Sequence, residues 1–103
     1  MTVLIFGRNG QLAKALQRSL IAQKVNFLCY GREQLDLLNY KDHLSRVINK
    51  VKPSIVINAS AYTNVIGAEK NKNSAFLLNA EAPKFMARIC KIKDIPFIHF
   101  STD

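Results

Sequence analysis

Cysteine and histidine, which hold many disulfide-bonded and zinc-dependent domains together, are scarce in this sequence. Its 103 residues include two cysteines and two histidines. Cys29 and Cys90 form no Cys-x-x-Cys pair, and neither has a histidine partner at the spacing of a metal-ligand set. The sequence therefore predicts buried, reduced thiols and no metal site.

Long hydrophobic runs are also absent. The apolar run Val3–Phe6 is far too short to cross a bilayer, and no basic segment precedes it as in a secretory signal peptide. We therefore expect a cytoplasmic protein that does not associate with a membrane.

Acidic residues are few, since seven Asp and Glu stand against fifteen Lys and Arg, for a formal net charge of +8. Such an excess can indicate a nucleic-acid partner. However, Lys84, Arg88 and Lys91 share a helical face without the aromatic platform that stacks on bases. We expect no nucleic-acid partner, and a positive field that favours an anionic cofactor or nucleotide sugar.

Length and composition are those of one small globular domain. The chain is 49% hydrophobic and 21% charged, as is usual for globular proteins. One hundred and three residues allow a single hydrophobic core and no more. We therefore interpret residues 1–103 as one domain.

The opening of the chain carries the strongest local pattern. A buried-strand pattern, Val3–Phe6, ends at Gly7, and Gly10 precedes a helical pattern that begins at Leu12. A strand, a glycine turn and a helix present backbone N–H groups and the positive end of the helix dipole to a phosphate. Gly7 allows a sharp turn, Gly10 allows close approach of a pyrophosphate, and Ala13 keeps the helix near the strand. Taken alone, this spacing also fits an ordinary strand–helix turn without a ligand.

Strands and helices alternate along the rest of the chain. The hydrophobic patterns predict strands at Val3–Phe6, Val25–Tyr30, Leu35–Leu37, Ser54–Asn58 and Ile95–Phe100. They predict helices after Gly10, over Tyr40–Val51, and in two or three pieces between Asn64 and Asp94, with a new start at Pro83. This alternation predicts an α/β fold, a doubly wound parallel sheet of order 3-2-1-4-5 with its ligand crevice beside the first strand. We interpret His99, inside the last predicted strand, as a packed core residue rather than a catalytic base.

The residues after the second predicted strand bear on the choice of cofactor. An acidic residue there would hold the ribose hydroxyls of NAD. This chain instead has Gly31 and then Arg32, which can face the 2′-phosphate of NADPH, although Glu33 follows directly. NADPH is therefore favoured, and NADH stays open.

Several blocks of residues stand out together along the chain. They are Gly7-x-x-Gly10-Gln11-Leu12, Leu35-Asp36, Val56-Ile57-Asn58-Ala59-x-Ala61-Tyr62-Thr63, Ala68-Glu69, Asn79-Ala80-Glu81-Ala82-Pro83 and His99-Phe100-Ser101-Thr102-Asp103. In these blocks the chain resembles, from end to end, the dTDP-4-dehydrorhamnose reductase family of the extended short-chain dehydrogenase/reductases. The blocks after the fourth and fifth predicted strands are together hard to obtain by chance.

The resemblance implies a Rossmann-like NAD(P)-binding domain in residues 1–103. In this family a hydride from NADPH or NADH reduces the 4-keto group of dTDP-6-deoxy-L-lyxo-4-hexulose and yields dTDP-L-rhamnose. By position, the pyrophosphate would contact Gly7, Asn9, Gly10, Gln11 and Leu12. Adenine would contact Asp36 and Leu37, and the nicotinamide side would be lined by Ala59, Ala61 and Tyr62. Thr102 would be the hydroxyl member of the catalytic set.

The chain departs from the family pattern in three respects, the mildest of which is Ala13 in place of the third glycine. Ile66 replaces a carboxylate at a helix start, and Gly67 weakens that helix by up to about 1 kcal/mol. The family's Tyr-x-x-x-Lys pair and its substrate-binding domain have no counterpart in residues 1–103. We therefore expect an incomplete domain, truncated after the fifth strand and inactive as a fragment, with a nucleotide-sugar substrate only in a full-length relative.

Two further expectations concern partners. The alternative to a reductase domain is a non-catalytic nucleotide-binding regulatory subunit of the same fold. In addition, an apolar last strand at the edge of the sheet is a template for pairing with another chain, so self-association through this strand is expected.

Overall fold

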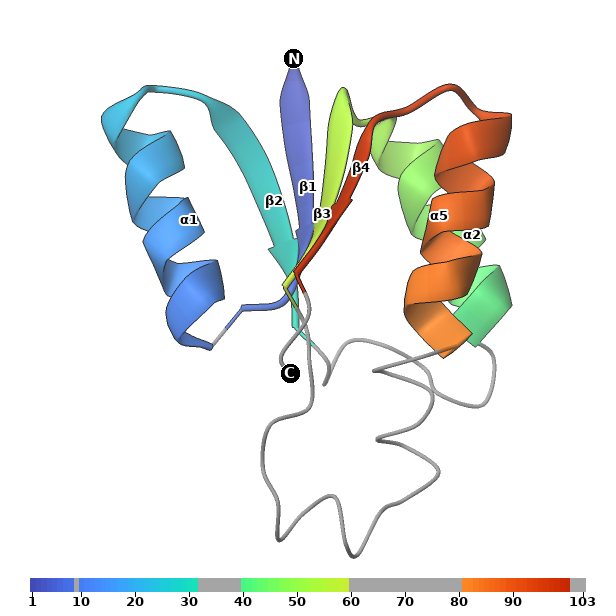
Figure 1. Ribbon diagram of the computed structural model, residues 1–103. Coiled ribbons are helices and arrows are strands. Elements are labelled where there is room, and N and C mark those ends of the chain that lie inside the picture. Colours follow the sequence, from blue (N-terminus) through green and yellow to red (C-terminus); the bar gives the residue numbers. More distant parts are fainter. Residues whose placement is uncertain (9, 32–39, 60–80, 101–103) are drawn as a thin grey trace, which may run out of the picture.

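The structure, a computed structural model, describes residues 1–8, 10–31, 40–59 and 81–100. Its elements alternate along the chain, as Figure 1 shows. They are β1 (Thr2–Phe6), α1 (Gln11–Ala22), β2 (Asn26–Tyr30), α2 (Tyr40–Val51), β3 (Ile55–Asn58), α5 (Ala82–Ile92) and β4 (Phe97–His99). The predicted strand Leu35–Leu37 lies outside the described residues.

The described strands form one parallel sheet of order β2-β1-β3-β4. β1 lies in the centre and pairs with β2 in the register Leu4↔Leu28 and with β3 in the register Leu4↔Val56. β3 in turn pairs with β4. The order confirms the predicted doubly wound arrangement, in which the chain steps to one side of β1 and then to the other.

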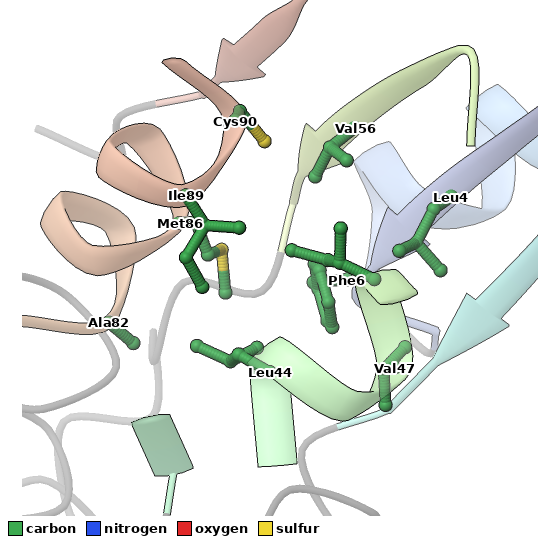
Figure 2. Close-up of a cluster of buried hydrophobic side chains, with 10 residues drawn as sticks. Leu4, Phe6, Leu44, Val47, Val56, Ala82, Met86, Ile89 and Cys90 are labelled. Carbon is green, nitrogen blue, oxygen red and sulfur yellow. The ribbon is translucent and has the colours of Figure 1, made fainter. Parts of the chain in front are cut away.

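Helices cover both faces of the sheet, with α1 on one face and α2 and α5 on the other (Figure 1). The larger core lies under α2 and α5, where Phe6 of β1 and Val56 of β3 meet Leu44 and Met86 of the two helices (Figure 2). The predicted apolar face of α2 is confirmed, because Leu44, Val47 and Ile48 are all buried. Pro83 stands in the first turn of α5, as predicted, where its fixed φ suits the helix start and no N–H is needed.

The core under α1 is smaller, and Ala13 is the buried residue of that helix. The spacing that predicts this helix runs through Leu12, Ala15, Leu16, Ser19 and Leu20. Leu16 and Leu20 pack against Val3 and the other buried strand residues of this face, but Leu12 is 40% exposed. The predicted apolar face is thus right for Leu16 and Leu20, whereas Leu12, Ala15 and Ser19 are exposed.

β4 is less buried than the sequence predicts. Its three residues are partly buried or exposed, and Ile98 is 41% exposed. Phe97 packs against the core under α2 and α5, whereas Ile98 has the opposite side-chain direction, since successive residues of a strand point to opposite faces. The interpretation of His99 as a packed core residue is wrong, because this side chain is exposed.

Among the described segments, no helix is long and apolar enough to cross a membrane.

Both cysteines carry free thiols, as predicted. Cys90 is fully buried, but Cys29 is only partly buried, which corrects the prediction for that residue. Burial raises the pKa of the Cys90 thiol because a thiolate is poorly solvated in the core. Burial also raises the pKa of Cys29 and outweighs the opposing effect of the positive charge on Arg8.

These shifts predict a loss of stability in alkaline solution. A cysteine thiol in an unfolded chain has a pKa of about 8.5, which is lower than the raised pKa of Cys90 in the folded protein. The unfolded state therefore releases protons first, so the free energy of unfolding is unaffected below that pH and falls as pH rises through it. Urea unfolding followed from pH 7 to pH 10 measures this slope. Cys90→Ala should lower stability at all pH values but flatten the slope, and an unchanged slope would contradict the assignment to this thiol.

Candidate functional site

The carboxyl ends of the strands are held together by backbone hydrogen bonds at one level. Gly7 N–H donates to the carbonyl of Tyr30 (2.8 Å), which ties the end of β1 to β2. Ala59 N–H donates to the carbonyl of Phe6 (2.7 Å), which ties the segment after β3 to β1. The chain therefore leaves β1 and β3 at fixed, adjacent points. This edge lies at the bottom of the sheet in Figure 1.

Gly7 makes the turn that ends β1. Its φ is 127°, in the region that side chains rarely adopt, and it is buried. A substitution at this position would strain the backbone at the point where the chain bends toward α1. The need for glycine at position 7 thus comes from the fold itself.

Gly10 is different, because the fold does not require glycine there. It caps the N-terminus of α1 with φ −72° and ψ 161°, which any residue can adopt. A Cβ built at Gly10 would meet no atom within 4 Å. The missing side chain therefore leaves open space directly in front of the helix, of the kind that a close-approaching ligand needs.

The first turn of α1 offers hydrogen-bond donors to that space. The first intrahelical bond runs from Lys14 N–H to the carbonyl of Gly10 (3.0 Å), so the N–H groups of Gln11, Leu12 and Ala13 lie ahead of it. No side chain caps the helix, and no acidic residue stands in its first turn. This is the arrangement that binds phosphate oxygens through backbone N–H groups and the helix dipole.

Two residues that the sequence did not single out shape the turn between β1 and α1. Gln17 Nε2 donates a hydrogen bond to the carbonyl of Arg8 (3.0 Å) and so ties the second turn of α1 back to this segment. Arg8 is exposed and lies near enough to Cys29 for its positive charge to favour the thiolate. It therefore adds positive charge between the ends of β1 and β2.

A pair of side chains lies at the same edge, on β3 and β4. Asn58 and His99 occupy opposed positions in the register of these strands. Asn58 is 1% exposed, and its Nδ2 lies 3.0 Å from Nδ1 of His99. Sequence reasoning missed this pair because it interpreted His99 as a core residue. The sequence did contain a signal for this pair, because Asn58 and His99 are each a polar residue at the end of an apolar strand.

The structure describes five of the twelve predicted site residues. Gly7, Gly10, Gln11, Leu12 and Ala59 all lie at the carboxyl edge, and Gln11 and Leu12 are exposed. Asn9, Arg32, Asp36, Leu37, Ala61, Tyr62 and Thr102 lie outside the described residues. In the part of the chain that is described, no three His, Cys, Asp or Glu side chains gather where they could hold a metal ion.

Comparison with known proteins matches this chain over its whole length. The family model described as the RmlD substrate binding domain matches residues 1–103. A dTDP-4-dehydrorhamnose reductase from Burkholderia thailandensis is 37% identical over 103 residues, which are 100% of this chain and 34% of that protein. The chain thus spans about a third of the length of this curated relative.

Solved structures agree with the sequence comparison. A dTDP-4-dehydrorhamnose reductase from Clostridium acetobutylicum superposes with a TM-score of 0.79 at 31% identity, over 94% of this chain and 34% of that one. The enzyme of Bacillus anthracis, solved in complex with NADP, gives a TM-score of 0.76 at 30% identity, over 93% of this chain and 34% of that one. Given the family match over residues 1–103, this chain belongs to the RmlD substrate-binding-domain family, and it resembles the dTDP-4-dehydrorhamnose reductases within the Rossmann-like fold.

Proposed function

We propose that residues 1–103 are the NAD(P)-binding domain of a dTDP-4-dehydrorhamnose reductase-like oxidoreductase in nucleotide-sugar biosynthesis. One observation carries the proposal. Gly10 keeps the N-terminus of α1 open although neither its backbone angles nor its surroundings require a glycine. The relative from Bacillus anthracis, solved with NADP, has the same fold. A dinucleotide pyrophosphate is the ligand that this opening suits best.

By their positions in the family pattern, the predicted site residues would bind each part of the cofactor. The turn at Gly7, the segment through Asn9, and the first-turn N–H groups at Gln11 and Leu12 would hold the pyrophosphate. Asp36 and Leu37 would contact adenine, and Arg32 would face the 2′-phosphate. Ala59 lies beside the end of β1, and with Ala61 and Tyr62 it would line the nicotinamide side. When bound, NADPH or NADH supplies the hydride.

The reduction of a ketone also needs a proton donor for the forming alkoxide. A tyrosine beside a lysine serves this role in the family, but each tyrosine of residues 1–103 has another residue at the fourth following position: Gln34, Leu44 and Ile66. Thr102 would help to hold the substrate carbonyl, although a threonine hydroxyl is a poor acid. We propose that residues 1–103, taken alone, bind the cofactor without turning over the sugar nucleotide.

Gly10→Val tests the pyrophosphate site. Valine fits the extended angles of this position, and its Cβ meets no protein atom, so folding should be retained. Its side chain would occupy the space of the phosphates and break charge-assisted hydrogen bonds, so NADPH affinity should fall at least about tenfold. Fluorescence titration measures the affinity, and circular dichroism checks the fold.

Ala15→Val is the matched control for Gly10→Val. Ala15 is exposed and lies in the same helix one turn further on, so it receives the same side chain outside the site. This variant should bind NADPH like the wild type. Equal affinities of the wild type and Gly10→Val would mean that the pyrophosphate binds elsewhere.

Arg32→Ala tests the choice between the two cofactors. A charge-assisted contact with the 2′-phosphate is worth about 1.5–3 kcal/mol, so NADPH affinity should fall roughly 10- to 150-fold while NADH affinity changes little. Arg18→Ala, which removes an exposed arginine of α1, controls for the loss of one positive charge. A similar loss for both cofactors would exclude the 2′-phosphate role.

We also propose that β4 mediates self-association of this chain. Within the described residues β4 pairs with β3 alone and stands at one edge of the sheet, where an apolar strand can pair with a second copy. Ile98→Lys should reduce association in light scattering. Ile92→Lys changes an isoleucine of α5 that is 78% exposed and should have little effect. A wild-type chain that stays monomeric at high concentration would contradict the proposal.

A further inference from the structure

The side-chain hydrogen bond between Asn58 and His99 is not needed to join β3 to β4. The backbone already ties β3 to β4, because Val56 N–H donates to the carbonyl of Pro96 (3.0 Å) and Phe100 N–H donates to the carbonyl of Asn58 (3.1 Å). The side-chain bond adds an imidazole with a fixed orientation. Asn58 is 1% exposed, whereas His99 is exposed, so the buried partner holds a ring that remains accessible.

The bond to Asn58 selects one tautomer of His99. An amide Nδ2 can only donate, so Nδ1 of His99, 3.0 Å away, accepts the hydrogen bond. A neutral imidazole that accepts at Nδ1 carries its proton at Nε2. Nε2 is the ring nitrogen that Asn58 does not contact, so the bond to Asn58 leaves the Nε2–H of this exposed side chain able to donate a further hydrogen bond.

The sheet order indicates which half of a bound dinucleotide would pass the end of β4. The glycine turn follows β1, and β4 lies two positions from β1 on the side opposite β2. With parallel strands spaced about 4.8 Å apart, β4 is roughly 10 Å from β1. Since Arg32 follows β2, the adenosine half would extend toward β2. The nicotinamide half would then extend over β3 and β4, where His99 ends its strand.

We propose that His99 binds the cofactor directly, donating a hydrogen bond from Nε2–H to an oxygen acceptor in the nicotinamide half of the dinucleotide. Asn58 is then a positioning residue, since it acts through the imidazole that it holds. This inference rests on the proposed function, and it adds a contact that the resemblance to the reductase family did not assign.

Nitrogen-15 NMR of the imidazoles tests the orientation without any assay of activity. His99 should show the tautomer protonated at Nε2, and saturating NADPH should shift its Nε2 signal. His43, on α2, is the only other histidine of the chain and serves as an internal reference whose signals should not move. A His99 ring protonated at Nδ1, or an Nε2 signal unmoved by NADPH, would overturn the inference.

Two substitutions separate the contact with the cofactor from the contact with Asn58. His99→Asn keeps an acceptor near the position of Nδ1 and removes the Nε2 donor. It should lower NADPH affinity roughly 2- to 12-fold, the range of one neutral hydrogen bond, with an unchanged melting temperature. His99→Gln places an amide N–H near the position of Nε2 and loses the acceptor. It should lower the melting temperature and keep NADPH affinity within about twofold of the wild type.

The opposite pattern would overturn the inference. If His99→Asn binds NADPH like the wild type and His99→Gln only loses stability, the histidine merely joins β3 to β4. That result would leave the pyrophosphate site at Gly10 intact, because the wild type still binds. Absence of NADPH binding by the wild type would instead remove the proposed function and, with it, this contact.

Discussion

Backbone hydrogen bonds at the carboxyl ends of the parallel strands set the geometry on which the candidate site depends. The bonds from Gly7 to Tyr30 and from Ala59 to Phe6 align the ends of β2, β1 and β3. In a parallel sheet all strands end at the same edge, so the segments that follow them gather there although they are distant in sequence. The buried residues under α2 and α5 stabilise this alignment from one face (Figure 2).

The two glycines of the first turn serve different purposes. Glycine is required at position 7 because the backbone there has a φ of 127°, which residues with side chains rarely adopt. The fold does not require glycine at position 10, because the φ and ψ angles of Gly10 suit any residue and a Cβ there would lie in open space. We propose that Gly10, a glycine that the fold does not need, allows a ligand to approach the backbone closely. The formal net charge of +8 adds a field that attracts an anionic ligand.

Local patterns were sufficient to predict most elements and their order. The apolar run of β1, the helical spacing of α2 and Pro83 at the start of α5 each agree with the structure. Local patterns failed to predict burial where contacts between residues distant in sequence determine it. The apolar run Ile95–Phe100 does not reveal that Ile98 remains 41% exposed, and the spacing of leucines does not reveal that Leu12 is 40% exposed. The bond between Asn58 and His99 depends on strand register, which joins residues 41 positions apart.

Amide proton–nitrogen correlation spectra during an NADPH titration give the most direct test of the central claim, that the first turn of α1 binds the pyrophosphate. The signals of Gln11, Leu12 and Ala13 should shift together as NADPH binds, because their N–H groups would donate to phosphate oxygens. Ile21 and Ala22, at the opposite end of α1, should stay unchanged. Shifts confined to the exposed basic residues Lys84, Arg88 and Lys91 of α5, or no shift in the first turn at high NADPH, would contradict the account.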